Sequence, residues 1–187
     1  MKVRGQTQSF KTVRPGARTL IDFSLHELTD HRFGGDYDAG PRRAKALTPK
    51  GIATLLIRGN TDFIVTGPIT GAEQRYPCPC SRFNSHNVAV TTVRTFRERP
   101  AEIAREVAAF CRVAKDPVEV TVPKKGISAF DHPEGPLYEP QGPRFFLQGL
   151  EGAPADGMSV RKPPAHINDE AFSDAILEAL DRVMAAR

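Results

Sequence analysis

Two histidines and an aspartate are placed where they could carry out acid–base chemistry. His86 stands directly before a predicted strand, and His166 follows the last predicted strand. Asp131 lies in a long segment rich in glycine and proline. A histidine can act as a general base near neutral pH, and a carboxylate can orient it. We therefore predict His86, His166 and Asp131 as catalytic candidates, although histidines in loops more often serve only as hydrogen-bonding groups.

A double glycine followed by an arginine pair could bind an anion. Gly34 and Gly35 end one predicted helix, and Gly40-Pro41 begins another, with Arg42 and Arg43 behind it. Free amides at a helix N-terminus attract phosphate or carboxylate, and an arginine can add a bidentate contact. Ordinary turn chemistry explains the same glycines and proline equally well. The local sequence leaves both interpretations open.

Acidic residues precede this double glycine. Asp22 ends a predicted strand, which is where enzymes with parallel sheets place functional groups. Ser24 and Glu27 have the spacing of a capping box, in which each side chain bonds a free amide at the helix start. Capping explains part of the role of Glu27, whereas Asp22 has no structural explanation.

A second candidate for anion binding follows the strand predicted at residues 118–122. Lys124 and Lys125 precede Gly126 and Ser128 in a loop predicted over residues 123–143. Loops of this length are usually functional. The alternative interpretation is that the lysines form a solvated basic pair and that Ser128 is a turn former.

Metal and disulfide chemistry have little support in the sequence. His26 and Asp30 share a helix face, but no H-E-x-x-H spacing accompanies them, so we predict no metal site. The three cysteines form an odd, sparse set that fits a reducing compartment better than a disulfide framework. Cys111 lies on an apolar helix face and is expected in the core.

The composition is that of one ordinary globular domain. The chain has 187 residues, 40% of them hydrophobic and 7% aromatic, with a formal net charge of +4. No basic stripe interleaved with aromatic residues is present, so nucleic acid is an unlikely partner. No apolar run approaches the length of a membrane span, and residues 1–15 lack a signal-peptide core. We expect a cytoplasmic protein with no membrane partner.

Strands alternate with helices along the chain. We predict strands at residues 17–23, 52–57, 62–65, 88–93, 118–122 and 158–160, and helices at 24–32, 41–50, 100–114, 145–150 and 168–185. Long loops are predicted at 67–79 and 123–143. This alternation predicts an α/β fold with a mostly parallel sheet flanked by helices, in a Rossmann-like three-layer sandwich. Residues 1–16 are expected to form an irregular lead-in to a single domain over residues 17–187.

Five segments, taken in order, resemble the Tm-one-like ATP-binding protein family, an uncharacterised family named after a plant resistance protein. The resemblance rests on the following residues: Asp22, Ser24, Glu27 and Asp30, then Gly34-Gly35 and Ala39-Gly40-Pro41 with Arg43; Asp62 to Gly67; His86-Asn87 with Arg94-Thr95; Pro123, Gly126, Ser128 and Asp131 with Gly135-Pro136; and His166-Ile167-Asn168-Asp169 with Phe172.

The resemblance implies the second, C-terminal domain of such proteins. A first, Rossmann-like domain would contribute much of a site for ATP or another nucleotide with Mg²⁺. We therefore expect a companion chain carrying that domain, or other copies of this chain, to complete a cleft for a small anionic ligand. The residues expected to bind the ligand are Asp22, Glu27, Gly34, Gly35, Gly40, Arg43, Asn87, Gly126 and Ser128.

Two other functions stay open. One is an enzyme, of hydrolase or lyase type, that acts on a small phosphorylated or carboxylated metabolite through a His/Asp acid–base pair. The other is a module that interacts with protein or RNA, which the plant member of the family suggests.

Overall fold

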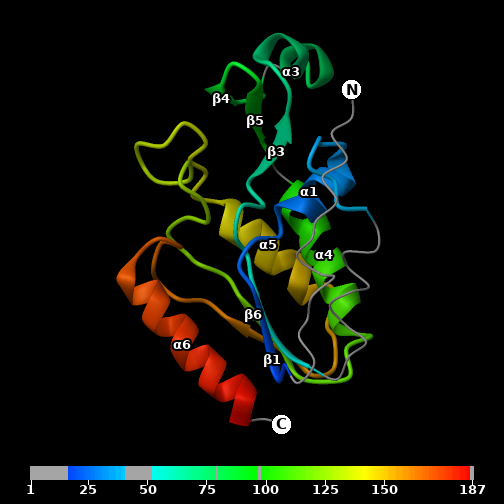
Figure 1. The fold of residues 1–187 in the computed structure, drawn as a ribbon, viewed down its shortest axis with the longest axis vertical. Coiled ribbons are helices and arrows are strands. Elements are labelled where there is room, and N and C mark those ends of the chain that lie inside the picture. The colour runs from blue at the N-terminus through cyan, green and yellow to red at the C-terminus, as the bar shows by residue number, and fades with distance from the viewer. Residues whose placement is uncertain (1–16, 41–51, 79, 97, 186–187) are drawn as a thin grey trace.

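A parallel sheet forms the centre of the molecule (Figure 1). The computed structural model describes residues 17–40, 52–78, 80–96 and 98–185. The four strands are β1 (Thr19–Asp22), β2 (Ala53–Ile57), β6 (Val118–Thr121) and β7 (Met158–Arg161), in the order β1-β2-β6-β7. All three pairings are parallel. β2 is buried along its whole length because its sequence is almost wholly apolar and both faces of the sheet are covered.

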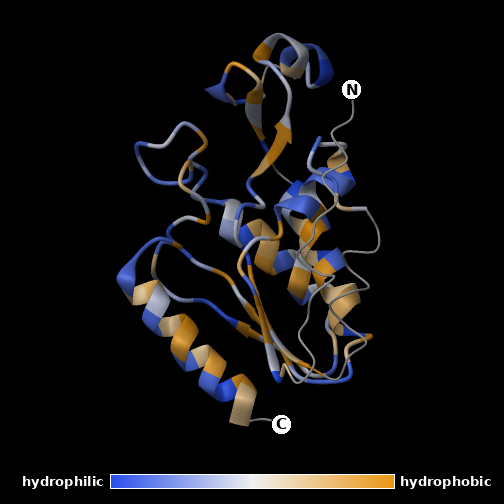
Figure 2. Ribbon diagram, viewed as in Figure 1, coloured by the Kyte–Doolittle hydropathy of each residue, from blue (hydrophilic) through white to orange (hydrophobic). Residues whose placement is uncertain are grey.

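Helices cover the two faces of this sheet, which makes three layers. On one face lie α4 (Arg99–Cys111) and α5 (Gly142–Glu151), with α1 (His26–Phe33) beside them; α6 (Glu170–Ala185) covers the other face (Figure 1). Alternate residues of β2 point to opposite faces. Leu56 packs toward α4 and α5, whereas Leu55 packs toward α6. Hydrophobic residues concentrate along the strands and the helix faces that cover them (Figure 2). The predicted three-layer α/β fold is confirmed.

A second, smaller sheet lies beyond the end of the first (Figure 1). It is antiparallel, in the order β3-β5-β4, with β3 at Phe63–Thr66, β4 at Phe83–Asn87 and β5 at Val90–Arg94. The short helix α3 (Ile69–Arg75) joins β3 to β4. The sequence prediction was wrong here in two respects. Residues 67–79 contain a helix rather than a continuous loop, and His86-Asn87 lie within a strand rather than before one.

The predicted capping box at Ser24 and Glu27 does not form. α1 begins at His26, and no side chain caps it. Ser24 Oγ instead contacts His26 Nδ1 at 3.0 Å and accepts a hydrogen bond from Asn60 Nδ2 at 3.2 Å. Glu27 is consequently the second residue of the helix, one position too early to reach back to its start. The predicted glycine stop is confirmed, because Gly34 ends α1 in the left-handed conformation with φ of +81°.

The other predicted elements differ from the structure only near their ends. Asp169, rather than the predicted Asn168, directly precedes α6, and its carbonyl oxygen accepts the amides of Phe172 and Ser173. Residues 123–141 contain no helix or strand, as predicted for this loop. The predicted helix at 41–50 and the lead-in at 1–16 lie outside the described residues.

A disulfide joins Cys78 and Cys80, which the sequence did not predict. Cys111 is a free thiol that is 2% exposed on α4, as expected of a core residue. Among the helices that the structure describes, none has the length and apolar character that crossing a membrane requires.

Candidate functional site

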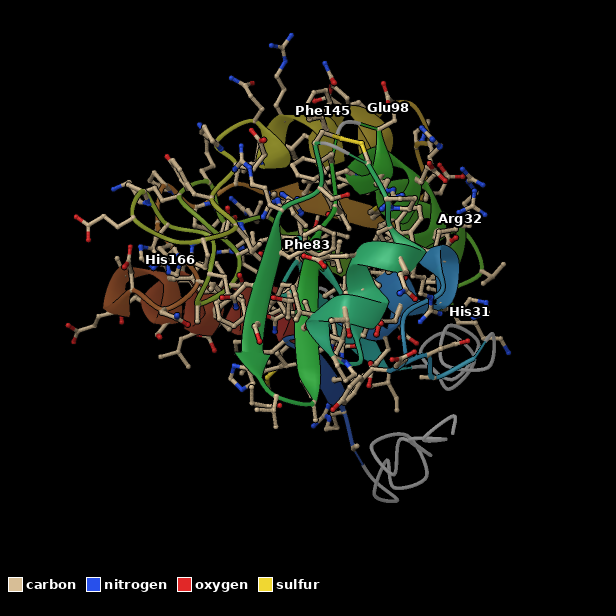
Figure 3. The ribbon with its side chains drawn as sticks, turned by 90° about the horizontal axis from the view of Figure 1, so that it is seen from above. His31, Arg32, Phe83, Glu98, Phe145 and His166 are labelled. Atoms are coloured by element: carbon tan, nitrogen blue, oxygen red, sulfur yellow. A yellow bond between two sulfur atoms is a disulfide. The ribbon has the colours of Figure 1, made fainter. Side chains whose placement is uncertain are left out.

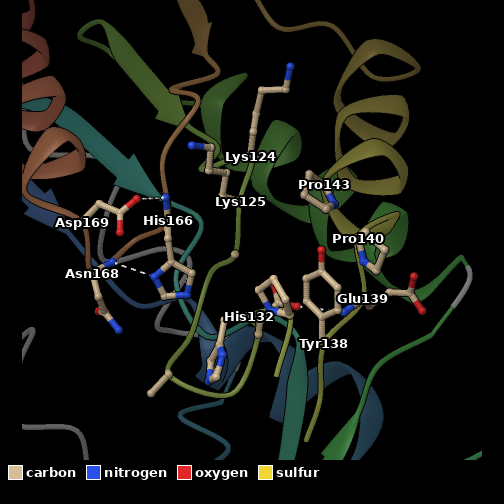
Figure 4. A pocket seen from close by; sticks show the side chains of 14 residues that line it. Lys124, Lys125, His132, Tyr138, Glu139, Pro140, Pro143, His166, Asn168 and Asp169 are labelled. Atoms are coloured by element: carbon tan, nitrogen blue, oxygen red, sulfur yellow. Dashed lines mark hydrogen bonds between the residues drawn. The ribbon is translucent and has the colours of Figure 1, made fainter. Parts of the chain in front are cut away.

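A pocket of about 650 Å³ lies beyond the carboxyl ends of β6 and β7 (Figure 4). The chain segments that follow these two strands supply most of its wall, and the first turn of α5 closes the opposite side. The lining residues are Lys124, Lys125, Gly126, Ala129, Asp131, His132, Pro133, Tyr138, Glu139, Pro140, Pro143, His166, Asn168 and Asp169. Ligands of open α/β sheets bind at this edge, so the pocket is the candidate site.

Backbone pairing fixes the two segments after the strands. The amides of Lys124 and Lys125 donate to the carbonyl oxygens of Pro163 and Ala165 at 3.0 and 3.1 Å. These bonds continue the parallel β6–β7 pairing past the strand ends. Both lysine side chains are exposed at the pocket. The backbone of this segment is therefore held by the β7 side, and two exposed lysines line the pocket.

Gly126 allows the loop to turn back under His166. Its φ is +140°, which residues with a side chain rarely adopt. A β-carbon at this position would lie 1.9 Å from the carbonyl oxygen of Asp131 and 2.4 Å from Cδ2 of His166. Close packing therefore explains the glycine that the sequence analysis assigned to ligand binding.

Both ring nitrogens of His166 contact main-chain groups, and Figure 4 shows the bond at Nδ1. Nε2 lies 3.1 Å from the carbonyl oxygen of Ser128, and Nδ1 accepts the amide of Asn168 at 3.1 Å. Because Nδ1 accepts a hydrogen bond, Nε2 is the ring nitrogen that can donate one to the carbonyl oxygen of Ser128. In this arrangement His166 can act as a base only after its bond to Asn168 breaks.

Asp131 and Ser128 connect the pocket to a buried cluster of charged groups. Asp131 accepts the amides of Ile127 and Glu139, at 3.2 and 3.0 Å, and pairs with Arg94 Nη1 at 3.4 Å. Ser128 Oγ donates to Asp62 Oδ2 at 2.6 Å. Asp131, predicted as catalytic, and Ser128, predicted to bind the ligand, thus lie in one cluster, and their hydrogen bonds hold the loop in place.

Arg58, Arg94 and Asp62 complete this cluster at the junction of the two sheets. Arg58 directly follows β2, Arg94 ends β5, and Asp62 directly precedes β3. The exposed fractions of the three residues are 0%, 1% and 0%. Arg94 Nη1 pairs with Asp62 Oδ2 at 3.2 Å. Burial raises the pKa of Asp62 to about 6, and burial followed by the charge of Arg94 lowers the pKa of Arg58 to about 9.

Sequence reasoning missed Arg58 because Arg58-Gly59-Asn60 has the composition of an exposed turn. One signal was available, since Arg58 directly follows the most apolar strand of the chain. A residue there lies at the carboxyl edge of the sheet and can be buried under the connections that cross it.

The other predicted ligand-binding residues lie elsewhere. Of those that the structure describes, only Gly126 lines the pocket, with Ser128 behind it. Figure 3 shows His31 and Arg32, at the C-terminal end of α1, on the opposite side of the molecule from His166. The residues that do not line the pocket are Asp22, Glu27, Gly34, Gly35, Gly40, His86 and Asn87. Arg43 lies outside the described residues.

Asp22 and His86 have local contacts of their own. Asp22 ends β1, two strands away from β6, and its Oδ1 accepts the amide of Ser24 at 3.3 Å. The ring of the exposed His86 lies against that of Phe130, with centroids 6.2 Å apart. Roles for Asp22 and His86 in binding or catalysis stay predictions. In the described part of the chain, no group of three His, Cys, Asp or Glu side chains is arranged to hold a metal ion.

Comparison with known proteins gives one consistent result. Residues 14–184 match the family described as "Uncharacterised protein family (UPF0261) C-terminal domain". The chain is 25% identical over 181 residues to a UPF0261 protein of Brucella melitensis, covering 97% of this chain and 43% of that protein. It is 28% identical over 166 residues to a UPF0261 protein of Clostridium tetani, covering 88% of this chain and 41% of that protein.

A plant protein is similar as well. The chain is 26% identical over 162 residues to the ToMV resistance protein Tm-1(GCR237) of Solanum lycopersicum, covering 86% of this chain and 21% of that protein. The chain therefore spans less than half the length of each of these relatives.

Proposed function

The chain belongs to the uncharacterised protein family UPF0261, whose C-terminal domain it matches, and from this premise we propose that it is a ligand-binding module. It supplies one wall of a cleft for a nucleotide or another small anionic ligand. The resemblance drawn from the sequence is confirmed, and the ligand is what we propose. The pocket beyond β6 and β7, with Lys124 and Lys125 in its wall, is the observation that carries it.

The charges around the pocket favour an anion. Lys124 and Lys125 are exposed there, whereas two of the carboxylates are already engaged. Asp131 is paired with Arg94, and Asp169 accepts the amide of His166 at 2.8 Å. The free positive charges can therefore attract phosphate or carboxylate groups.

A second wall would come from outside this chain. The chain spans 43% and 41% of the two bacterial relatives. Small-molecule sites commonly lie between domains, where most of the ligand surface is buried. In this proposal a companion domain, or a second copy of the chain, completes the cleft, and ATP or another nucleotide with Mg²⁺ is the leading candidate ligand.

A nucleotide panel tests this function. Thermal unfolding is measured with each nucleotide, with and without Mg²⁺, for the wild type and for the double variant Lys124→Ala/Lys125→Ala. The exposed pair Lys115→Ala/Lys162→Ala is the matched control for charge. We expect a nucleotide to raise the Tm of the wild type and of the control variant, but not that of the Lys124→Ala/Lys125→Ala variant. No rise with any ligand, alone or with the companion domain, would reject the proposal.

The alternative of an acid–base enzyme has less support. His166 is held by main-chain groups at both nitrogens, and Asp131 is tied to Arg94 and two amides. His86 projects from β4 and does not line the pocket. The binding proposal needs none of these bonds to break.

A further inference from the structure

Arg58 is a fully buried cation that forms no ion pair with any carboxylate in the described part of the chain. Its Nε donates to Thr61 Oγ1 at 3.2 Å, and its guanidinium carbon lies 4.7 Å from the ring centroid of Phe146. Its terminal nitrogens, Nη1 and Nη2, have no hydrogen-bond partner among the described residues. A buried charge is normally paired, because leaving it unpaired is strongly unfavourable.

A second buried guanidinium lies beside the first, on Arg94. Its Nη1 contacts the carboxylates of Asp62 and Asp131, whereas Nε and Nη2 lack a partner within the described ranges. The carboxylates of Asp62 and Asp131 therefore both contact Arg94, and neither forms an ion pair with Arg58.

The two guanidinium groups converge on the first residue of α5. A β-carbon added to Gly142 would lie 3.1 Å from Arg94 Nη2 and 3.6 Å from Arg58 Nη2. A helix N-terminus carries partial positive charge and favours anions. Two unpartnered nitrogens, the Nη2 atoms of Arg58 and Arg94, thus lie at the positive end of a helix, and among the described residues the nearby carboxylates of Asp62 and Asp131 pair only with Nη1 of Arg94.

We propose that Arg58 and Arg94, together with the start of α5, bind one oxyanion group of the ligand, either phosphoryl or carboxylate. The inference rests on the proposed function and names the anchor point of the ligand. The planar guanidinium fork matches the geometry of both oxyanions. The guanidinium group of Arg58 lies over the ring of Phe146, so the terminal nitrogens of Arg58 are positioned before the ligand arrives.

The turn of residues 139–142 separates this anchor from the open pocket. Glu139 and Pro143 line the pocket, and Gly142 between them contacts the arginines. Glu139 Oε1 accepts the amide of Gln141 at 3.3 Å, so its carboxylate lies at the start of α5. An incoming oxyanion meets this negative charge close to the anchor, and Glu139 therefore opposes binding of the ligand there.

Inorganic phosphate is the first probe. Unfolding of the 187-residue chain is followed in rising phosphate, with chloride at matched ionic strength, for the wild type, Arg58→Met and the exposed control Arg105→Met. Phosphate also stabilises proteins without binding, by exclusion from their surface. We expect a saturating rise of about 3–6 °C in the wild type and the control. Arg58→Met should show only the rise in Tm that does not saturate, which comes from exclusion of phosphate from the protein surface. An equal saturating rise in Arg58→Met, or none in the wild type, overturns the inference.

Glu139→Gln provides a test in the opposite direction that does not depend on how Arg58→Met folds. Removing this nearby negative charge should lower the phosphate concentration at half-saturation by about three- to tenfold. An unchanged or raised concentration overturns the inference. The same series with malonate shows whether the anchor takes carboxylate as well as phosphoryl groups.

Nucleotide titrations separate this inference from the proposed function. A nucleotide that binds Arg58→Met as tightly as the wild type overturns the arginine anchor and leaves the binding module intact. Phosphate binding that depends on Arg58, without any larger ligand, keeps the anchor and overturns the nucleotide site.

Discussion

Asp30 is a buried carboxyl group that ties α1 to the second sheet. Its exposed fraction is 0%, and its two oxygens accept the amides of Val65 and Tyr37, each at 2.9 Å. A β-carbon on Gly35 would lie 2.1 Å from its carboxyl carbon. The double glycine after α1 therefore makes room for Asp30, which explains Gly35 without a ligand.

Burial raises the pKa of Asp30 from 3.8 to about 7, against the two amide bonds that lower it. Between these values the folded chain binds more protons than the unfolded chain, so stability falls as pH rises from about 4 to about 7. Asp30→Asn lacks this titration. We expect its stability deficit relative to the wild type to shrink over that window, by up to about 4 kcal/mol. Urea unfolding at a series of pH values measures this, and a constant deficit would contradict it.

Gly126 is expected to tolerate no side chain. In Gly126→Ala the new β-carbon must displace the carbonyl group of Asp131 or the ring of His166, and the residue keeps a φ of +140°. The free energy of unfolding should fall by about 2–4 kcal/mol. Gly71→Ala, which meets nothing within 4 Å inside α3, is the control and should be neutral or slightly stabilising. Equal stability of the two variants in urea would refute this role.

At the scale of elements, α4 and α5 pack closely because Gly149 has no side chain. A β-carbon there would lie 2.5 Å from the carbonyl oxygen of Ala101 and 2.7 Å from Ala104 Cβ. Gly149→Ala should push the helices apart and lower stability by about 1–3 kcal/mol. Gly152→Ala adds a β-carbon 3.4 Å from the nearest atom and serves as control. Denaturant midpoints measure the difference, and a Gly149→Ala midpoint at or above that of the control would contradict it.

The elements that the sequence predicted well are those with strong apolar periodicity. β2 and α4 were placed within one to three residues, because ATLLI and the Ile103/Val107/Cys111 face leave few alternatives. β4 was missed, since its sequence FNSHN is polar and it pairs only along an edge of the small sheet. α3 was missed because its seven residues include a glycine and follow Pro68. Tertiary contacts specify such short elements more than local sequence does.

The candidate site was predictable in its position more than in its residues. The carboxyl edge of a parallel sheet and the long loop after β6 pointed to the loop containing Gly126, Ser128 and Asp131. The meeting of Arg58 and Arg94 in one buried cluster was not predictable, because it depends on how β5 of the small sheet packs against the loop after β2. That contact joins segments far apart in the sequence, and no local pattern encodes it.

At the scale of the whole molecule, the charged cluster lies where the chain crosses between the two sheets. One crossing runs from β2 through Arg58 and Asp62 into β3, and the other leaves β5 at Arg94 for α4. A ligand that binds Arg58 and Arg94 would contact both crossings at once. Ligand binding would then stabilise the attachment of the small sheet as well as the pocket.

The open pocket leads to an expectation about the companion domain. A ligand held by one wall leaves much of its surface in water, whereas complete small-molecule sites bury most of it. We expect the chain together with a companion domain to bind its nucleotide at least about tenfold more tightly than the chain alone. Calorimetry measures both affinities, and light scattering shows whether the tighter species is a heterodimer or a pair of this chain. The double variant Lys124→Ala/Lys125→Ala should weaken binding in both forms. Equal affinity with and without any partner would mean that the pocket of this chain is already a complete site.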